Sequence, residues 1–539
     1  MGSTLPFLLL LLQTVVVHVS ADQIPVIKYV QCANSTISNH PVVMKGKRFY
    51  DSQTDQYFPV KGIAYYPRPN EGTLSTGSNS VDFFTEGFRH LWEPDIAQLQ
   101  QLGVNTIRIY AVDPSQNHDA FMCALQSVGI HVIVGLLADC DGCAIGPNEA
   151  PSCYPASLKA RGQWIINEFS KYANTLAFSA GNEVTLYARD RQIQLNAPCQ
   201  KKFLRDMRAY VSTCSEVLNS ILPRKVPIGL VNWDHERQLQ ATYFGCQNDP
   251  NDPLEPVEWY GLNAYQHCNP NIPLVGWEQM RQDFEAINLP GPMIVAEYGC
   301  RESSFPTVGE FQAQRTWEQV DALYSETYSN VFAGGVVFEY SAEKLVADTS
   351  PQGNPWPYNG FMKLQYGVGY YTPLECDHLT THCQYIPYPE YESLRTKLAA
   401  VDVSYVPNMS QQDNSNVGQI PQCPQGIPSI LDFEWLTDME PDLPCYVVAT
   451  RPPTFAPSES PSMVPSATPS LRPTVSPTNF TESMDDDDNE ELSSNDTDSD
   501  EENSTNPDDE DEGPLWYSSS TRSGFWLTFI AALWMSIPC

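Results

Sequence analysis

Two glutamates follow apolar runs at the points where buried strands would end. Glu183 comes directly after Leu176–Asn182, in the segment AGNEV, and Glu297 stands in the segment AEYG after another apolar run. A carboxylate in such a place costs free energy unless it has a partner or a task. A retaining glycosidase needs two carboxyls, one as general acid and then base, the other to attack the anomeric carbon. The pair therefore predicts an enzyme that breaks a glycosidic bond.

Polar and aromatic residues gather at the same strand ends. Asn182 directly precedes Glu183 and can hydrogen-bond a sugar 2-hydroxyl, an interaction that strengthens in the transition state. Tyrosine rings offer stacking surfaces and a hydroxyl, although filling the core is the alternative for each of them. We expect Arg108 to restrain a glutamate by its charge and Tyr265 to hold Glu297 ionised. The residues expected to bind the substrate are Tyr65, Tyr110, Asn182, Tyr265 and Tyr340.

Other chemistries lack their usual motifs. His118, His131 and His267 show no metal-ligand spacing, and no Ser-His-Asp arrangement or phosphate loop is visible. We therefore expect neither a metal nor a cofactor. The formal net charge is −35, and residues 482–512 contain 17 Asp or Glu and no Lys or Arg, so the rest of the chain is only mildly acidic. An acidic face argues against nucleic acid, whose phosphates need basic partners.

Apolar runs alternate with helical segments between residues 22 and 400. Runs such as HVIVGLL are apolar throughout, as parallel strands buried on both faces must be. Eight such strands alternating with helices predict a (β/α)₈ TIM barrel, in which the fourth and seventh strands place Glu183 and Glu297 across the mouth. The alternative, an open doubly wound sheet, is weakened because no glycine-rich loop follows the first strand. The expected strands are Val60–Tyr65, Val104–Tyr110, His131–Leu137, Leu176–Asn182, Val226–Val231, Trp259–Ala264, Met293–Glu297 and Gly335–Tyr340; the expected helices include Asp95–Leu102, Arg161–Ala173, Lys202–Leu222 and Gly309–Tyr328.

The ends of the chain differ in composition from the barrel. An apolar stretch followed by Val19-Ser20-Ala21 predicts a cleaved signal peptide. A Pro/Ser/Thr-rich region is typical of an extended stalk, and the acidic run after it should be disordered. A short apolar tail behind small residues is the pattern for attachment of a glycosylphosphatidylinositol (GPI) anchor, with a tail-anchored helix as the alternative. The expected segments are a signal peptide at 1–21, the barrel at 22–400, a cysteine-containing extension at 401–450, the stalk at 451–481, the acidic segment at 482–513 and the GPI signal at 514–539.

Fifteen cysteines indicate an oxidising compartment. Cys539 would leave with the GPI signal, so an even number remains for disulfides. The close spacing of Cys140 and Cys143 favours a disulfide over metal or redox chemistry in a secreted chain. Sequons for N-glycosylation begin at Asn34, Asn408, Asn479, Asn495 and Asn503.

The chain also resembles the fungal β-1,3-glucanosyltransferases of glycoside hydrolase family 72 over residues 45–375. That resemblance implies a retaining barrel on a lipid-anchored surface enzyme that remodels β-1,3-glucan, with Glu183 as acid/base and Glu297 as nucleophile. It also implies active-site roles for Tyr110, Asn182 and Tyr265. The segments that carry it are KGIAYYPRP, LGVNTIRIYAVDP, FSAGNEV, YGLNAYQHC, VAEYGC and GGVVFEYS.

The sequence departs from the family pattern at three positions that should line the sugar sites. Tyr66 replaces a glutamine, Gly135 an aspartate and Phe338 a tyrosine.

The cysteines also differ from the family pattern. The usual partner of Cys123 is missing, Cys140, Cys143 and Cys153 are extra, and the family's eight-cysteine module is absent. We expect a disulfide between Cys268 and Cys300, because they follow neighbouring strands and the resemblance agrees. Cys246 is expected to pair with Cys376 or Cys383.

The sequence therefore predicts a retaining β-1,3-glucan transglycosylase, GPI-anchored at the plasma membrane or held in the cell wall, and monomeric. The first alternative is a hydrolase of β-1,3-glucan on the same barrel, which would share every catalytic residue. The second is a non-catalytic glucan-binding surface protein, against which the presence of both glutamates argues.

Overall fold

The computed structural model describes the barrel and most of the segment after it. The expected signal peptide, stalk, acidic segment and GPI signal lie outside the described residues, as does Cys268. Among the residues that are described, no helix is long and apolar enough to cross a membrane. The described residues are 30, 32 and 40–445, except 217, 219–223, 266–270, 272–273, 349–355, 358, 362–363 and 413–417.

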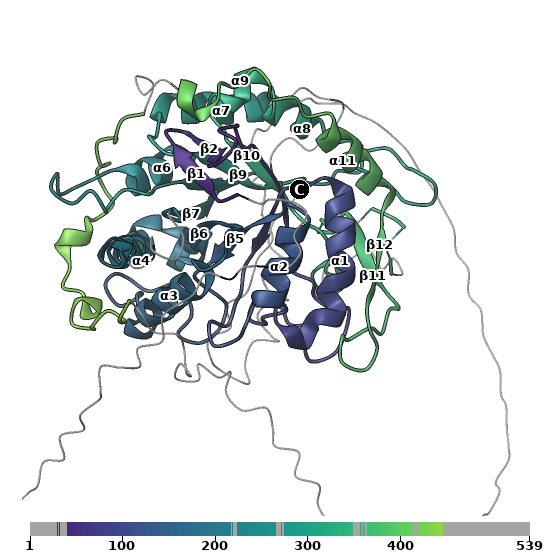
Figure 1. Ribbon diagram of the computed structural model, residues 1–539, viewed down its shortest axis with the longest axis horizontal. Coiled ribbons are helices and arrows are strands. Elements are labelled where there is room, and N and C mark those ends of the chain that lie inside the picture. The colour runs from purple at the N-terminus through teal and green to yellow at the C-terminus, as the bar shows by residue number, and fades with distance from the viewer. Residues whose placement is uncertain are drawn as a thin grey trace, which may run out of the picture. The chain divides into compact units, whose positions relative to one another are not determined.

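Eight of the described strands, all parallel, close into a barrel in which the last strand pairs with the first (Figure 1). The TIM barrel predicted from the sequence is confirmed, and each expected strand overlaps one observed strand. In chain order the strands are β3 (Val60–Ala64), β4 (Thr106–Ile109), β5 (His131–Gly135), β6 (Thr175–Asn182), β7 (Ile228–Trp233), β8 (Tyr260–Asn263), β9 (Met293–Tyr298) and β10 (Gly334–Val337).

The barrel strands are buried because side chains pack on both of their faces. All four residues of β4 and all six of β9 are buried, including Arg108 and Glu297. Parallel strands in such a layer read as continuous apolar runs, which explains why the sequence located them well. A charged residue inside such a run has to find its partner within the barrel.

Helices surround the barrel, and two short hairpins flank it (Figure 1). The hairpins are β1 (Val42–Lys45) with β2 (Arg48–Asp51), and β11 (Gly369–Thr372) with β12 (Gln384–Pro387). The helices are α1 (Arg89–Leu102), α2 (Asp119–Ser127), α3 (Ala156–Phe169), α4 (Ile193–Thr213), α6 (Arg237–Gly245), α7 (Val275–Ile287), α8 (Glu318–Leu323), α9 (Glu326–Ser329), α10 (Lys344–Asp348) and α11 (Pro389–Ala399).

The helix expected over Gly309–Tyr328 is wrong in its first half. Helical structure begins only at α8, because Ala313 and Trp317 have φ values of 51° and 62°. Such left-handed conformations interrupt a right-handed helix. Conversely, α4 starts earlier than the expected Lys202 and includes Pro198.

The segment after α11 packs against the outside of the barrel. Its short 3₁₀ helices are Met409–Gln411, Ile430–Asp432 and Leu436–Asp438. Lys159 on α3 donates to the carbonyl oxygens of Thr437 and Glu440 at 3.0 and 2.7 Å, and Lys202 on α4 pairs with Asp438 at 2.7 Å. The described part of this extension therefore attaches to α3 and α4.

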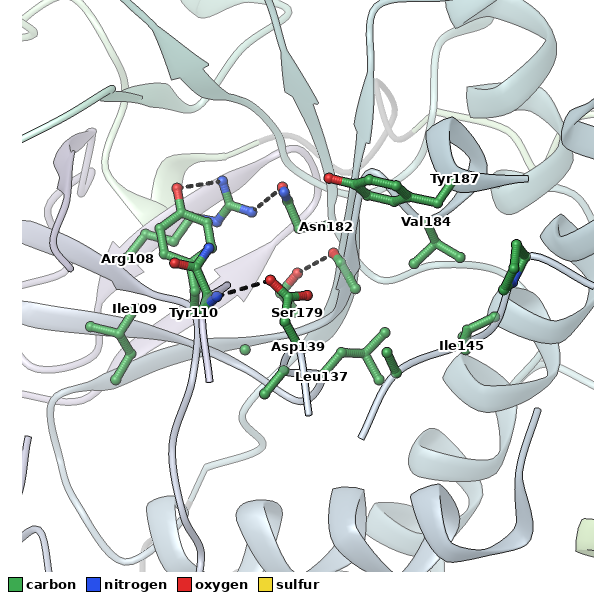
Figure 2. Close-up of a pocket in the computed structure, with 16 residues that line it drawn as sticks. Arg108, Ile109, Tyr110, Leu137, Asp139, Ile145, Ser179, Asn182, Val184 and Tyr187 are labelled. Atoms are coloured by element: carbon green, nitrogen blue, oxygen red, sulfur yellow. Dashed lines mark hydrogen bonds between the residues drawn. The ribbon is translucent and has the colours of Figure 1, made fainter. Parts of the chain in front are cut away.

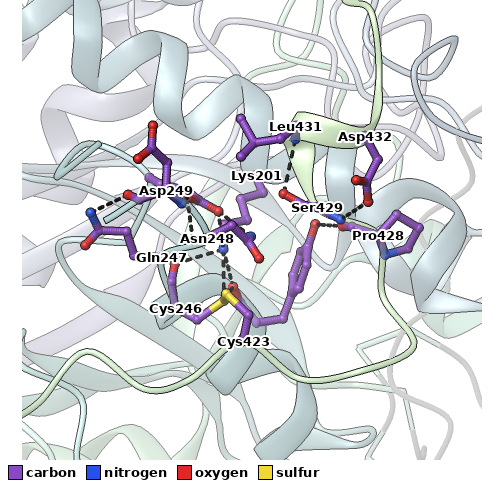
Figure 3. The surroundings of a disulfide bond; sticks show 12 residues. Lys201, Cys246, Gln247, Asn248, Asp249, Cys423, Pro428, Ser429, Leu431 and Asp432 are labelled. Atoms are coloured by element: carbon purple, nitrogen blue, oxygen red, sulfur yellow. Dashed lines mark hydrogen bonds and ion pairs between the residues drawn. A yellow bond between two sulfur atoms is a disulfide. The ribbon is translucent and has the colours of Figure 1, made fainter. Parts of the chain in front are cut away.

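Two disulfides join the extension to the barrel covalently. Cys246, after α6, bonds to Cys423, and Cys214, after α4, bonds to Cys445. Figure 3 shows the first bond beside the buried amine of Lys201, which donates to the carbonyl oxygen of Cys246 at 2.9 Å. These two bonds hold the extension against the barrel, so it does not need a hydrophobic core of its own to stay in place.

The other described disulfides correct part of the expected pairing. Cys376 and Cys383 bond to each other across the turn between β11 and β12, so neither is available to Cys246. Cys123 does have a partner, Cys32. Cys300 is disulfide-bonded, but its expected partner Cys268 is outside the described residues, so that pairing stays a prediction. The remaining bonds are Cys140–Cys143 and Cys153–Cys199.

Removing the Cys246–Cys423 bond should destabilise the protein much more than removing Cys140–Cys143. The two bonds span 177 and 3 residues, and a cross-link restricts the unfolded chain more when it closes a longer loop. We expect the Cys246→Ser/Cys423→Ser variant to lose about 2–4 kcal/mol in denaturant unfolding. Equal losses for this variant and for Cys140→Ser/Cys143→Ser would contradict the argument.

Candidate active site

The end of β6 brings two consecutive residues into one network. Successive side chains of a regular strand point to opposite faces. Here the pairing of β6 with β7 shifts register between Ser179 and Asn182, and Glu183 has a φ of 49°. Such irregularities re-aim side chains. As a result, Asn182 and Glu183 both accept a hydrogen bond from the same amide, the Nδ2 group of Asn263.

Glu297, in β9, is fully buried and accepts hydrogen bonds at both oxygens. Its Oε1 accepts from Arg108 Nη1 and from the Tyr110 hydroxyl, each at 2.8 Å, and its Oε2 accepts from the Tyr265 hydroxyl at 2.6 Å. Three donors, one of them a cation, stabilise the ionised carboxylate. The expected contacts of Arg108 and Tyr265 with a glutamate are confirmed. This arrangement suits a nucleophile that has to carry a negative charge.

Glu183 lies in a different environment, although it too is buried. Its carboxyl has one described hydrogen bond, from Asn263 Nδ2 to Oε1 at 2.7 Å. Burial, and then the negative charge of Glu297, raise the pKa of Glu183 to about 8. The carboxyl is therefore protonated at neutral pH. A protonated and an ionised carboxyl side by side are what an acid and a nucleophile require.

Asn263, at the end of β8, is a site residue that the sequence analysis missed. It lies opposite Glu297 in the β8–β9 pairing and donates to both Glu183 and Asn182. Asn182 in turn accepts from Arg108 Nη2 at 2.6 Å. The position of Asn263 at the end of an apolar run, in the segment YGLNAY, was a usable signal. One continuous polar network thus joins the two glutamates.

A pocket opens beside this network, between the ends of β4 and β6 and the loop after β5 (Figure 2). Gly135 contributes to its lining, and a Cβ atom there would lie 2.7 Å from the carbonyl oxygen of Tyr110. The close approach of the two backbones therefore requires glycine. The pocket is lined by Asn79, Arg108, Ile109, Tyr110, Gly135, Leu137, Ala138, Asp139, Ala144, Ile145, Pro147, Ser179, Gly181, Asn182, Val184 and Tyr187.

Two of the tyrosines expected to bind sugar belong to the core instead. Tyr65 and Tyr340 have exposed fractions of 0%, and their hydroxyls donate to Asp95 on α1 at 2.9 and 3.0 Å. Tyr371 adds a third donor, and burial raises the pKa of Asp95 to about 6. A buried carboxyl needs hydrogen-bond donors, and because no cation among the described residues donates here, the tyrosine hydroxyls fill that role. The expected sugar contact is therefore wrong for these two residues.

The positions that depart from the family pattern have separate environments. Tyr66 is buried, and its hydroxyl donates to the carbonyl oxygen of Val81 at 3.1 Å. Phe338 is also buried and packs edge-on against Tyr265, the ring centroids being 6.0 Å apart. Phe338 therefore supports one of the groups that hold Glu297, while Gly135 shapes the pocket.

A closed parallel barrel with two carboxyls at the ends of its fourth and seventh strands is the arrangement that barrel glycosidases use. The chain belongs to the glucanosyltransferase family, glycoside hydrolase family 72, whose family model matches residues 31–346. The resemblance noted in the sequence is thereby confirmed.

Relatives in fungi match the barrel rather than the whole chain. The 1,3-beta-glucanosyltransferase gas5 of Schizosaccharomyces pombe is 32% identical over 306 residues, 56% of this chain and 54% of that protein. The 1,3-beta-glucanosyltransferase gel2 of Aspergillus fumigatus is 31% identical over 324 residues, 58% and 61% of the two chains. This chain thus spans little more than half the length of these relatives.

Solved structures show the same fold. Saccharomyces cerevisiae Gas2p in complex with laminaritriose and laminaritetraose has a TM-score of 0.54 and 25% identity, covering 72% of this chain and 75% of that one.

Activity should fall at alkaline pH as Glu183 loses its proton. A general acid must be protonated, and the folded-state pKa of about 8 means that the proton is present below this pH and lost above it. We expect kcat/KM on an unactivated oligosaccharide to drop about tenfold per pH unit above that value. An aryl glycoside whose leaving group departs without protonation should show a much weaker drop. An alkaline limb centred below pH 6 would contradict the assignment.

Proposed function

We propose that the protein is a retaining β-1,3-glucan transglycosylase, which cleaves one glucan chain and transfers the glycosyl part to another. The observation that carries the proposal is the unequal treatment of two neighbouring carboxyls. Arg108, Tyr110 and Tyr265 hold Glu297 ionised, whereas burial keeps Glu183 protonated.

In the first half of the reaction, Glu297 attacks the anomeric carbon while Glu183 protonates the glycosidic oxygen. The glycosidic bond breaks, the leaving chain departs with the proton, and an ester forms between the sugar and Glu297. As this ester forms, the negative charge on Glu297 disappears. The Coulomb repulsion that helped to keep Glu183 protonated disappears with it, so Glu183 can remain a carboxylate and act next as base.

In the second half, Glu183 takes the proton of an incoming hydroxyl, whose oxygen attacks the anomeric carbon. The ester bond breaks and Glu297 leaves as a carboxylate, again bound by its three donors. A glucan hydroxyl gives transfer and a longer chain, whereas water gives hydrolysis. Asn182 contributes an amide beside the reacting sugar, where the 2-hydroxyl would lie.

The proposed substrate is a neutral glucan. The relatives are named 1,3-beta-glucanosyltransferases, and the Gas2p structures contain laminari-oligosaccharides. Tyr110, Tyr265 and Asn182 are the groups proposed to contact the sugar, and the pocket beside Arg108 offers room for it. We propose neither a cofactor nor nucleic acid as a partner.

The same proposal includes a place of action. A signal peptide, a stalk and a GPI signal would hold a monomeric barrel at the cell surface, on the plasma membrane or in the wall, beside insoluble glucan. There the acceptor ends would be locally dense. Transfer would then compete with hydrolysis more effectively than in dilute solution.

Glu297→Gln should abolish turnover while leaving the fold intact. The amide keeps the size of the side chain and can still accept from Arg108, but it cannot form the ester. We expect kcat to fall by at least about a thousandfold, with an unchanged circular dichroism spectrum. Glu302→Gln, an exposed glutamate in the loop after β9, is the matched control and should retain wild-type activity. Residual turnover within tenfold of wild type would remove Glu297 as nucleophile.

Products longer than the substrate should appear when one pure β-1,3-gluco-oligosaccharide is the only sugar. Water is present at about 55 M, so transfer wins only if the site holds an acceptor in position and raises its effective concentration. We expect chain lengthening at millimolar substrate, measured by chromatography of labelled products. If only shorter products form, with reducing ends rising in step with cleavage, the enzyme is the hydrolase of the alternative.

A further inference from the structure

A carboxylate from the loop after β5 forms part of the pocket wall opposite the catalytic network (Figure 2). Its residue, Asp139, is held from outside the loop by the backbone of Asn79. The Asn79 N–H donates to Asp139 Oδ2 at 3.0 Å, and the Asp139 N–H donates to the Asn79 carbonyl oxygen at 3.1 Å. The carboxylate therefore has a defined orientation before any ligand arrives.

The loop that carries Asp139 is stiffened by two disulfides. Cys140–Cys143 closes a tight turn directly after it, and the Ala138 N–H donates to the Cys143 carbonyl oxygen at 3.2 Å. Cys153–Cys199 fastens the end of the loop to α4. Restricting a binding group in this way reduces the entropy lost when it takes up a ligand.

The carboxylate has unused capacity as a hydrogen-bond acceptor. An ionised carboxylate has about four acceptor sites. Among the described residues, the hydrogen bond from Asn79 is the one that the Asp139 side chain receives. Asp139 is half-buried, and this burial raises the pKa of its carboxyl. A carboxyl with spare acceptor sites at a pocket wall is suited to hydroxyl donors.

The pocket is also not closed at this wall. A second hollow over the disulfide-bonded loop shares Asp139, Ala144, Ile145 and Pro147 with it. Asp139 therefore lines both the pocket beside Arg108 and Asn182 and the hollow over the loop. A glucan chain that extends from one hollow into the other would pass this carboxylate.

We propose that Asp139 binds the hydroxyls of a glucose unit next to the one that reacts, and so determines which glucan is accepted. This inference rests on the proposed function. Glucose units joined through O3 present free hydroxyls at C2, C4 and C6, all of them donors that a carboxylate can accept. The glucan can be neutral, because the carboxylate is the charged partner in these hydrogen bonds. Hydrogen bonds to a charged group contribute more than those between neutral groups.

The decisive variant is Asp139→Asn, compared with Glu149→Gln as a matched control. The Asn side-chain oxygen can still accept from the Asn79 N–H, so the loop keeps its anchor, while an NH₂ group replaces the free acceptor. Glu149 is an exposed carboxyl of the same loop, outside both hollows, in an exposed ion pair with Arg189. Such a pair contributes little to stability.

Both variants are measured on a β-1,3-linked glucose pentasaccharide. Binding is measured by calorimetry with Glu297→Gln as the common background, and kcat/KM with the active enzyme. For Asp139→Asn we expect a Kd raised and a kcat/KM lowered by about tenfold or more, with an unchanged melting temperature. Glu149→Gln should stay within about twofold of wild type, since its carboxyl faces solvent. A second variant, Cys140→Ser/Cys143→Ser, keeps the carboxylate but loosens its turn, and should weaken binding by a smaller factor.

The failures of the two proposals are distinguishable. Suppose that the wild-type enzyme turns over the pentasaccharide, and that Asp139→Asn and Cys140→Ser/Cys143→Ser bind it as tightly as Glu149→Gln does. The role of Asp139 is then overturned and the proposed function stands. If the pentasaccharide binds in an Asp139-dependent way but no product forms, the role of Asp139 stands and the proposed reaction is overturned. A pentasaccharide that neither binds nor reacts overturns both.

Discussion

The active site depends on one buried guanidinium inside the barrel. Arg108, in β4, reaches across the mouth to Glu297 at 2.8 Å and to Asn182 at 2.6 Å, so one rigid side chain joins three strands. Burying the pair takes both charges out of water, which their mutual attraction offsets only with good geometry and further hydrogen bonds. Those further bonds come from Tyr110 and Tyr265. The Glu297 carboxyl is therefore oriented by three donors before a substrate arrives.

The same charge arrangement sets the state of the second carboxyl. Glu183 receives no hydrogen bond from the guanidinium among the described residues, and the ionised Glu297 acts on it across the network. Burial, and then the charge of Glu297, raise the pKa of Glu183, whereas the cation donates a hydrogen bond to Glu297. Asn263 donates to Glu183 and to Asn182, and so holds the Glu183 carboxyl in place without supplying a charge. The division of roles follows from position, not from residue type.

The sequence predicted the parts of the fold that depend on hydrophobic periodicity. Strands buried on both faces are apolar throughout, so all eight barrel strands and the two glutamates at their ends could be located. Features that depend on tertiary partners could not. The sequence placed Tyr65 and Tyr340 at strand ends, which suggested the rim of the barrel. In the structure their hydroxyls donate to Asp95, on a helix, and both rings lie in the core. Asn263 ends an apolar run, which was a usable signal, but its place opposite Glu297 depends on strand register. The left-handed backbone at Trp317 cannot be predicted from helix propensity.

The loop after β5 illustrates how this scaffold permits variation without disturbing the chemistry. The resemblance implied an aspartate at the end of that strand, where this chain has Gly135, and backbone contact with Tyr110 leaves no room for a side chain there. Four residues later the chain supplies Asp139, on a turn held by a disulfide rather than by the strand. Loops at the carboxyl end of a barrel are attached to the strands but are not part of them. A carboxylate can therefore be supplied from a different position in such a loop while Arg108 and the two glutamates keep their places on the strands. In the role proposed for Asp139, substrate choice is set by a loop cross-linked through Cys140 and Cys143, while Arg108, Glu183 and Glu297 keep the contacts that the barrel strands impose.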